Sequence, residues 1–405
     1  MKRLRRHGLH VAVIALVVAA AAIMSGTMLS GGRALQEPGA EAGLDGEVLD
    51  GSNVGREAES GRDHTARSGH RRGQENPVDD HGEAASNSDG AASAAPQTGT
   101  PTTVTYGPFV LPPAPPETAA AGQPVGGIRI GEVHLNFVLR EAPKPCNDCF
   151  LTTLRPDLVY PDGRPANLDT GVMLHHAVWF QAGQPDVTCG PETVVGRLGQ
   201  RFFASGNERT GATLVPGFGY HVDGSSWTLL VELMNHTNTP KTVNLRLDAT
   251  WLPNSPDTKP VTPIWLDVDN CRDSQYSAPA GPSRTQWRWT SARTGRLISA
   301  AGHLHDGGVK AVLTNHSSGR TVCTSFAAYG RNPAYRGSIE SMSACNWDAI
   351  GTVHAGEVLT LDSYYNLPAP RHDVMGIMLA YLYETTDLTA GTPPPERTEP
   401  EPTPS

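Results

Sequence analysis

Five side chains in two distant parts of the sequence have the types and spacing needed to bind a metal ion. His175 and His176 are adjacent in one apolar run, His303 and His305 flank a leucine in a second, and Met375 precedes a third. Imidazole is the commonest metal ligand in proteins, and a thioether beside two imidazoles favours copper over zinc, calcium or magnesium. The sequence therefore predicts a copper-binding protein in which Met375 supplies a third ligand to the second pair.

The two histidine pairs place different demands on the backbone. Side chains two residues apart on a strand point to the same face, so His303 and His305 can hold one ion together while Leu304 turns into the core. His175 and His176 are neighbours and point to opposite faces of a regular strand. They can bind one ion together only if the strand is twisted or bulged there.

Most of the other histidines need no metal to explain them. Three lie in a polar segment near the start of the chain, where we expect them to be solvated: His64, His70 and His81. An isolated histidine in a β-protein is usually a hydrogen-bonded structural residue or a solvated one. We interpret four more in this way: His134, His316, His354 and His372.

The termini have the composition of targeting and linker segments. A short basic start precedes an apolar stretch, so we assign residues 1–34 to a signal peptide, with an uncleaved membrane anchor as the alternative. Residues 35–105 have few large apolar side chains and are predicted to be a disordered linker, as is the proline-rich tail at 389–405. We therefore expect a secreted or extracytoplasmic protein that contacts a membrane only through an uncleaved N-terminal segment.

Charge and cysteine content restrict the possible partners and the compartment. The net charge is −9, and no basic run follows the first residues, so nucleic-acid binding has no support. The chain has 6 cysteines, an even number that favours disulfides in an exported protein. Their pairing is left open, and Cys146 and Cys149 could instead form half of a zinc site, although the chain has no second Cys-x-x-Cys.

Strand signals dominate the part between the linkers, and helical periodicity is nearly absent. Segments separated by Pro, Gly, Asn and Asp have strand patterns: 133–139, 174–181, 227–235, 243–251, 309–315, 357–365 and 376–383. Four prolines between Pro253 and Pro263 indicate a boundary. We therefore predict an all-β protein with two tandem jelly-roll or β-sandwich domains, at residues 106–255 and 256–388.

The segments around the histidines resemble the copper type II, ascorbate-dependent monooxygenases, above all the peptidylglycine α-hydroxylating monooxygenase core. Met173–Phe180 is similar to the His-His motif of that family, His303-Leu-His305 to its His-x-His motif, and Asp373–Met375 to the stretch that contains its methionine ligand. The resemblance implies two jelly-roll domains, each holding one copper ion, that face each other across a solvent-filled cleft.

Longer segments are similar to the stress up-regulated nodulin family. They are Pro156–Gly163, the Gly-His-x-His-x-Gly-Gly motif at His303, Ser341–Cys345 and Gly356–Ser363. This resemblance extends over residues 127–385, which is nearly all of the part predicted to fold.

The first-half ligand set departs from the family pattern. Gly217–Val222 and Trp227–His236 resemble the stretch that leads to a third imidazole, but that position falls on Met234. His236 lies two residues further along the same strand face, and His221 is a weaker candidate beside a turn. Three outcomes are open: Met234 is the ligand, His236 is the ligand after a local bulge, or the first copper is weak or missing.

The resemblance implies an exported copper-dependent monooxygenase that hydroxylates an unidentified small molecule or peptide with dioxygen. It implies up to two copper ions and ascorbate or another one-electron donor, with His303, His305 and Met375 at the oxygen-activating ion. By sequence proximity we expect Asp306 and Asp373 to orient the histidines by hydrogen bonds. The alternatives are a non-catalytic copper-binding or stress-related cell-surface protein, and an adhesion or ligand-binding β-sandwich that holds no metal.

Overall fold

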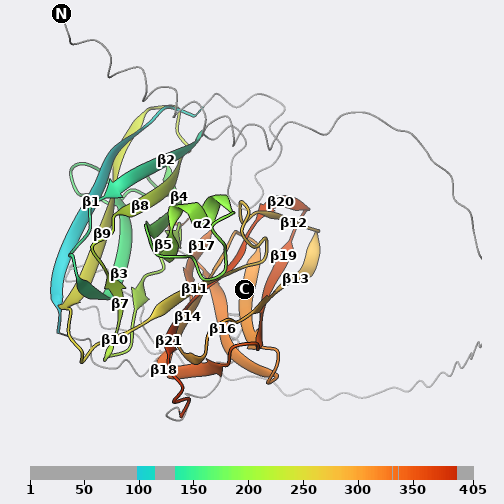
Figure 1. Ribbon diagram of the computed structural model, residues 1–405. Helices are drawn as coiled ribbons and strands as arrows, with labels where there is room; N and C mark the ends of the chain where they lie inside the picture. The colour runs from blue at the N-terminus through green and yellow to red at the C-terminus, as the bar shows by residue number, and fades with distance from the viewer. Residues whose placement is uncertain (1–97, 115–132, 331, 336, 390–405) are drawn as a thin grey trace, which may run out of the picture. The chain divides into compact units, whose positions relative to one another are not determined.

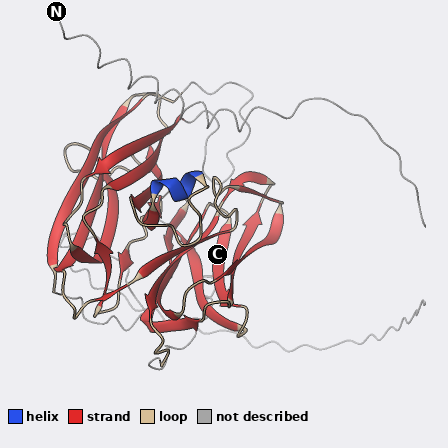
Figure 2. Ribbon diagram, viewed as in Figure 1, coloured by secondary structure: helices blue, strands red, loops and turns tan. Residues whose placement is uncertain are grey.

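The computed structural model describes residues 98–114, 133–330, 332–335 and 337–389. Strands dominate these residues, and the only helix within them is the short α2, Val194–Leu198 (Figure 2). The predicted all-β fold class is therefore confirmed. None of the described residues forms a helix long and apolar enough to cross a membrane. The predicted signal or anchor, most of the linker and residues 390–405 of the tail lie outside the described residues.

The first half of the folded part forms two sheets (Figure 1). Sheet I has the strand order β1-β9-β3-β7-β10, with β6 paired to β3, and sheet II has the order β2-β8-β4-β5. The strands of sheet I are β1 (Thr100–Leu111), β3 (Cys149–Val159), β6 (Ala212–Thr213), β7 (Phe218–Val222), β9 (Lys241–Pro253) and β10 (Lys259–Pro260). Those of sheet II are β2 (Val133–Ala142), β4 (Val172–Gln181), β5 (Gln200–Gly206) and β8 (Trp227–Asn235).

The second half forms two further sheets and a short ribbon. Sheet III has the order β11-β21-β14-β18, sheet IV the order β13-β19-β15-β16-β17, and the ribbon is β12-β20. The strands of sheet III are β11 (Thr262–Asp267), β14 (Gly295–Leu304), β18 (Ala344–Val353) and β21 (Gly376–Glu384). The others are β12 (Tyr276–Ala278), β13 (Gly281–Thr290), β15 (Gly308–Asn315), β16 (Arg320–Tyr329), β17 (Ile339–Met342), β19 (Val358–Leu367) and β20 (Arg371–Val374).

Alternating side chains determine which face of each strand is buried. In β9 the residues Val243, Leu245, Leu247 and Ala249 are buried and the residues between them are half-buried. This is the period-2 pattern of an antiparallel strand with one face in a core. Every segment for which the sequence predicts a strand lies in a strand of the structure, with small differences at the ends.

Two hydrophobic cores lie between the sheets. The first joins residues of sheets I and II, such as Leu247 of β9 and Trp179 of β4. The second joins residues of sheets III and IV, such as Leu382 of β21 and Leu361 of β19. The chain passes from sheet I to sheet III between β10 and β11, inside the proline-rich segment.

Sheets II and III also meet, through the faces that point away from these cores. Trp265, Met375 and Ile377 of the second half pack against Val178 and Ala204 of the first. We call this contact between sheets II and III the seam.

All six cysteines form disulfides, as predicted. Two bonds are local to one half, Cys146–Cys149 and Cys323–Cys345. The third joins Cys189, in the loop before α2, to Cys271, in the loop after β11, across 82 residues. It links loops from the two sides of the seam, and disulfides are typical of proteins in oxidising compartments.

The predicted start of the folded part needs a correction. The composition predicts a linker that ends at residue 105, but β1 begins at Thr100 and pairs with β9 from Thr100↔Trp251 onward. Four of the six residues from Thr100 to Thr105 are threonines, so the start of this edge strand contains little apolar surface and looks like a linker. Val104 is nevertheless buried in the first core.

A fold prediction follows from β1. A chain that begins at residue 106 should unfold at a lower temperature than one that begins at residue 98, because it lacks the first half of β1. Loss of buried Val104 alone should cost about 1.5–3 kcal/mol of unfolding free energy. Thermal unfolding of the two fragments tests this, and equal melting temperatures would show that residues 98–105 add nothing to the fold.

Candidate metal centre

The two adjacent histidines of β4 lie at an irregularity in the strand. Leu174 is opposite Leu233 on β8, but His176, two residues later, is opposite Glu232, so the register shifts between them. His175 is the extra residue, and the two imidazole rings lie with their centroids 4.1 Å apart. The bulge that the sequence required for joint binding is therefore present.

The second pair lies at the end of β14. His303 is opposite Ile377 on β21, and Leu304 between the two histidines is buried in the second core. His305 follows the strand directly, and Gly307 then turns the chain with a φ of 92°, a conformation that favours glycine. The predicted alternation of His303, Leu304 and His305 is confirmed.

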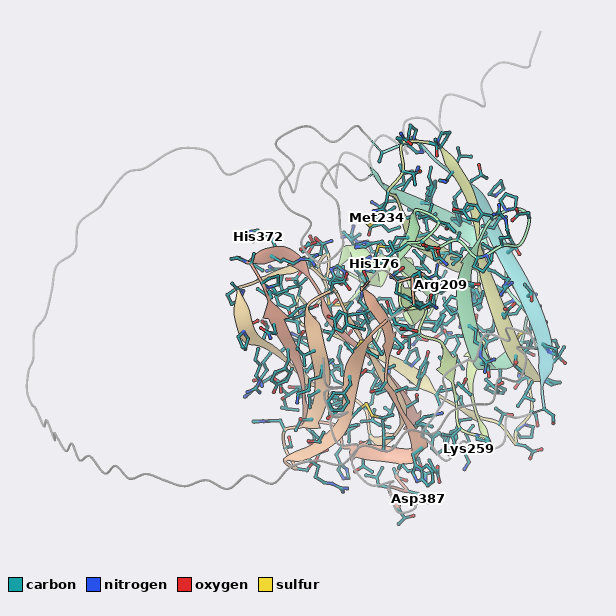
Figure 3. All side chains as sticks on the ribbon, turned by 180° about the vertical axis from the view of Figure 1, so that it is seen from behind. His176, Arg209, Met234, Lys259, His372 and Asp387 are labelled. Atoms are coloured by element: carbon teal, nitrogen blue, oxygen red, sulfur yellow. A yellow bond between two sulfur atoms is a disulfide. The ribbon has the colours of Figure 1, made fainter. Side chains whose placement is uncertain are left out.

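The two pairs meet at the seam and form one group of imidazoles, which we call the four-histidine cluster: His175, His176, His303 and His305. The Nε2 atoms of His176 and His305 are 3.1 Å apart, and the ring centroids of His176 and His303 are 5.2 Å apart. Candidate ligand atoms of His175, His176 and His305 all lie within 4.8 Å of one another. Figure 3 shows His176 between the two groups of strands.

This arrangement differs from the one that the family resemblance implies. Two ligand sets on opposite sides of a solvent-filled cleft were expected, whereas the imidazoles of the two halves are in direct contact. The difference arises because the bulge in β4 and the end of β14 both point into the seam, where sheets II and III pack together.

Two buried or half-buried glutamates hold the cluster from the first half. One carboxylate oxygen of Glu232 lies 3.0 Å from His175 Nδ1 and 3.1 Å from His176 Nδ1. A carboxylate oxygen of Glu208 lies 2.9 Å from His303 Nδ1, and so joins the first half to a histidine of the second. Metal-bound histidines commonly use their second ring nitrogen in this way, which fixes the tautomer and the ring orientation.

The remaining ring nitrogens fit a metal ion. His305 Nδ1 hydrogen-bonds the main-chain oxygen of Asp373, which leaves Nε2 directed toward His176. His303 Nε2 is buried and has no hydrogen-bond partner among the described residues. A buried polar atom without a partner is costly, and a bound cation would satisfy it.

The local electrostatics keep two of these imidazoles neutral. Burial and the neighbouring His175 lower the pKa of His176 to about 3, and the same two causes lower the pKa of His305 well below its usual value. At His303 burial acts in the same direction, but the Glu208 carboxylate outweighs it and raises the pKa. Neutral imidazole is the form that binds metal, so His176 and His305 can act as ligands at neutral pH.

Gly206 allows the close approach of the two halves at this point. It lies opposite His176 in the β4–β5 pair, and a Cβ atom there would come within 2.8 Å of His303 Cε1. Any larger residue would therefore displace the His303 ring or the Glu208 carboxylate. The sequence Gly-Asn-Glu at 206–208 has no pattern that indicates this role.

Met375 is buried next to Trp265 and Ile377 at the seam. The Tyr365 hydroxyl donates a hydrogen bond to the main-chain oxygen of Met375 at 2.5 Å and accepts one from the main-chain nitrogen of His305 at 2.8 Å. One buried side chain thus ties the backbones of two predicted copper ligands together. Met375 and His303 also line the same cavity.

The candidates for the third first-half ligand lie elsewhere along β8. Met234 is on the same strand as Glu232 but is fully buried against Leu168 and Met173. His236 follows the strand, and its main-chain nitrogen donates to Gly171 O. His236 is not among the histidines whose ligand atoms lie within 4.8 Å of one another. Its role and that of Met234 stay predictions.

Two further histidines of the described residues lie apart from the cluster. His221, the weaker candidate, hydrogen-bonds the Asp148 carboxylate at 3.1 Å and lies against the ring of Phe150. His372 is exposed and hydrogen-bonds Ser277 (Figure 3).

Sequence proximity was a wrong guide to the carboxylates that orient the histidines. The Asp306 carboxylate accepts hydrogen bonds from Ser338 and from the main chain of Ile339, so it holds β17 and not the cluster. The Asp373 carboxylate pairs with Arg371, and only its main-chain oxygen contacts His305. Of the two glutamates at the cluster, Glu232 has a signal in the sequence, because it is a single acid inside the apolar strand β8.

Comparisons with known proteins give three matches. Residues 244–385, which include the second histidine pair and Met375, match the family model described as stress up-regulated Nod 19. The chain is 28% identical over 274 residues to "probable copper-dependent oxygenase M1" of Phoma sp., covering 61% of this chain and 67% of that protein. It is 29% identical over 256 residues to "probable copper-dependent oxygenase clz3" of Cochliobolus lunatus, covering 57% of this chain and 78% of that protein.

A prediction separates the carboxylates seen at the cluster from those expected by sequence proximity. Glu232→Gln should weaken Cu(I) binding by about 10–100-fold, because Gln keeps the shape but loses the charge that orients His175 and His176. Asp306→Asn is the matched control and should bind copper like the parent. Competition with a chromogenic Cu(I) chelator measures both, and equal losses in the two variants would contradict the assignment.

Proposed function

We propose that this chain is a copper-dependent oxygenase of the stress up-regulated Nod 19, copper oxygenase-like family. The observation that carries the proposal is the convergence of His175, His176, His303 and His305 at the seam. The names of the two relatives support the metal and the reaction class.

Copper suits the donors that meet here. The imidazoles are neutral nitrogen ligands, and the thioether of Met375 is a soft donor of the kind that favours Cu(I). When bound, copper exchanges single electrons and activates dioxygen. The donors at the seam are mainly imidazoles. Calcium sites are typically built from oxygen ligands and structural zinc sites commonly contain cysteines, so these two kinds of site fit less well.

Side chains around the copper ligands orient them, balance charge and pack against them. Glu232 and Glu208 hold the imidazoles in fixed orientations and balance positive charge in a buried place. Tyr365 keeps His305 and Met375 at a fixed separation through their backbones. Trp265 and Ile377 pack beside Met375 and make that side of the centre apolar.

The proposal also includes finer features that the sequence predicts. In this proposal the sheet pairs I–II and III–IV correspond to the two predicted jelly-roll or β-sandwich domains, and the disulfides are consistent with an exported protein. The electron donor is ascorbate or another one-electron reductant. The reaction is hydroxylation by a monooxygenase, in which His303, His305 and Met375 hold the oxygen-activating ion.

We further propose that the four histidines bind copper as a unit to which both halves contribute. The double variants His175→Ala/His176→Ala and His303→Ala/His305→Ala should then each lose all tightly bound copper, because the rings touch across the seam. His221→Ala is the control, since that residue lies beside Asp148 and should leave the copper content unchanged.

Copper per chain after reconstitution with Cu(I) and desalting measures this, followed by oxygen consumption on addition of ascorbate. If one double variant keeps a copper ion, the halves hold separate ions as the sequence resemblance implies. If copper binds but oxygen is not consumed with any one-electron donor, the chain is a copper-binding protein and not an oxygenase.

Tyr365 provides a test of the methionine ligand. Tyr365→Phe leaves two buried main-chain groups without their partner, so it should lower the unfolding free energy by about 1–3 kcal/mol and weaken the copper–sulfur signal in X-ray absorption of the Cu(I) protein. Tyr276→Phe is the matched control, because its hydroxyl bonds Ser363 and neither ligand. Equal sulfur signals in the two variants would exclude a positioning role for Tyr365.

A further inference from the structure

A cavity of about 470 Å³ lies in the seam beside the four-histidine cluster. Sheet II contributes Val178 and Leu230 to its wall, and sheet III contributes Ile377 and Leu379. His176, His303 and Met375 line the same cavity, so a molecule bound in it would contact the metal centre. Its volume is in the range of small-molecule sites, about 300–1,000 Å³.

The wall of the cavity is largely hydrocarbon. Apart from the residues of the metal centre, aromatic side chains from both halves complete it, including Phe180, Phe203 and Trp265. Such walls favour apolar ligands, because burying apolar surface on both partners removes it from water.

The buried charges that line the cavity are already paired within the protein. The Arg201 guanidinium makes two contacts with the Asp186 carboxylate, at 2.8 and 3.0 Å, and lies 4.7 Å from the Trp265 ring. Glu208 is paired with His303. Besides Glu232, the other charged groups that line the cavity are Arg272 and Asp273, and both are exposed.

Glu232 is also paired within the protein, because its carboxylate contacts both histidines of β4. Among the described residues that line the cavity, every buried charge therefore has an opposite charge or an imidazole beside it. A charged ligand would lose its hydration without gaining an unpaired counter-charge, and that loss costs several kcal/mol.

We propose that this cavity binds a neutral, predominantly apolar small molecule, and that this is the substrate class of the proposed oxygenase. The role as substrate rests on the proposed function, whereas binding itself depends only on the cavity. A peptide carboxylate or an ammonium ion fits less well, because the buried charges of the wall already have partners and the other two, Arg272 and Asp273, are exposed to solvent.

Three naphthalenes of similar size and different charge test the proposal on the metal-free full chain at pH 7. They are 2-naphthol, 2-naphthoate and 2-naphthylmethylammonium, and calorimetry measures their binding. We expect 2-naphthol to bind at least 10-fold more tightly than either ion, which corresponds to about 1.4 kcal/mol or more. Equal or tighter binding of an ion, or no binding of 2-naphthol, overturns the proposal.

Variants locate the binding in the cavity. Leu230→Trp fills it from sheet II and should abolish 2-naphthol binding, and Ala301→Phe fills it from sheet III if the first variant does not fold. Val138→Trp is the control, because Val138 is 49% exposed on β2 and does not line the cavity. Unchanged binding in a folded filling variant places the probe elsewhere and overturns the proposal.

Copper content is measured on a second portion of the same preparation, after reconstitution with Cu(I) and desalting. If the chain holds no copper but binds 2-naphthol in the cavity, the proposed oxygenase fails while the ligand class stands. If copper and oxygen consumption are as expected but only an ion binds, the ligand class fails alone.

Discussion

The contact between imidazoles of the two halves is the interaction on which the rest of the structure depends. His176 and His305 come from different sheets and from distant parts of the chain, yet their ring nitrogens are within hydrogen-bond distance. Such an approach requires a bulge in β4, a small residue at Gly206 and a strand end at His305. It also requires carboxylates that hold the rings, because adjacent buried imidazoles resist protonation and must be oriented to share a cation.

The seam around this contact has a polar end and an apolar end. At one end polar groups are concentrated around the imidazoles, where Glu232 pairs with His175 of a neighbouring strand and Glu208 pairs with His303 of the opposite half. At the other end apolar side chains of sheets II and III leave a cavity between them. A low-dielectric wall next to a metal centre excludes competing water and strengthens the electrostatic contacts of the centre itself.

Local patterns in the sequence were enough to predict the strands, because side-chain alternation in segments such as β8 and β9 reflects a single buried face. They also showed that His175 and His176 could bind one ion together only if the strand were twisted or bulged. The partners across the seam could not be predicted in this way. Glu208 contacts His303 only because sheets II and III pack against each other, and no spacing in the sequence encodes that packing. Asp306 is a neighbour of His305 in sequence but turns toward β17, which shows why proximity along the chain is a poor guide in a β-protein.

The Cys189–Cys271 disulfide has a consequence for how the centre assembles. It joins the loop before α2 to the loop after β11, and so covalently connects one side of the seam to the other. The second-half histidines are then held at a high effective concentration around the first pair, even when the ring contacts are broken. In the oxidised chain, metal capture resembles the closing of a preformed chelate more than the meeting of two independent domains.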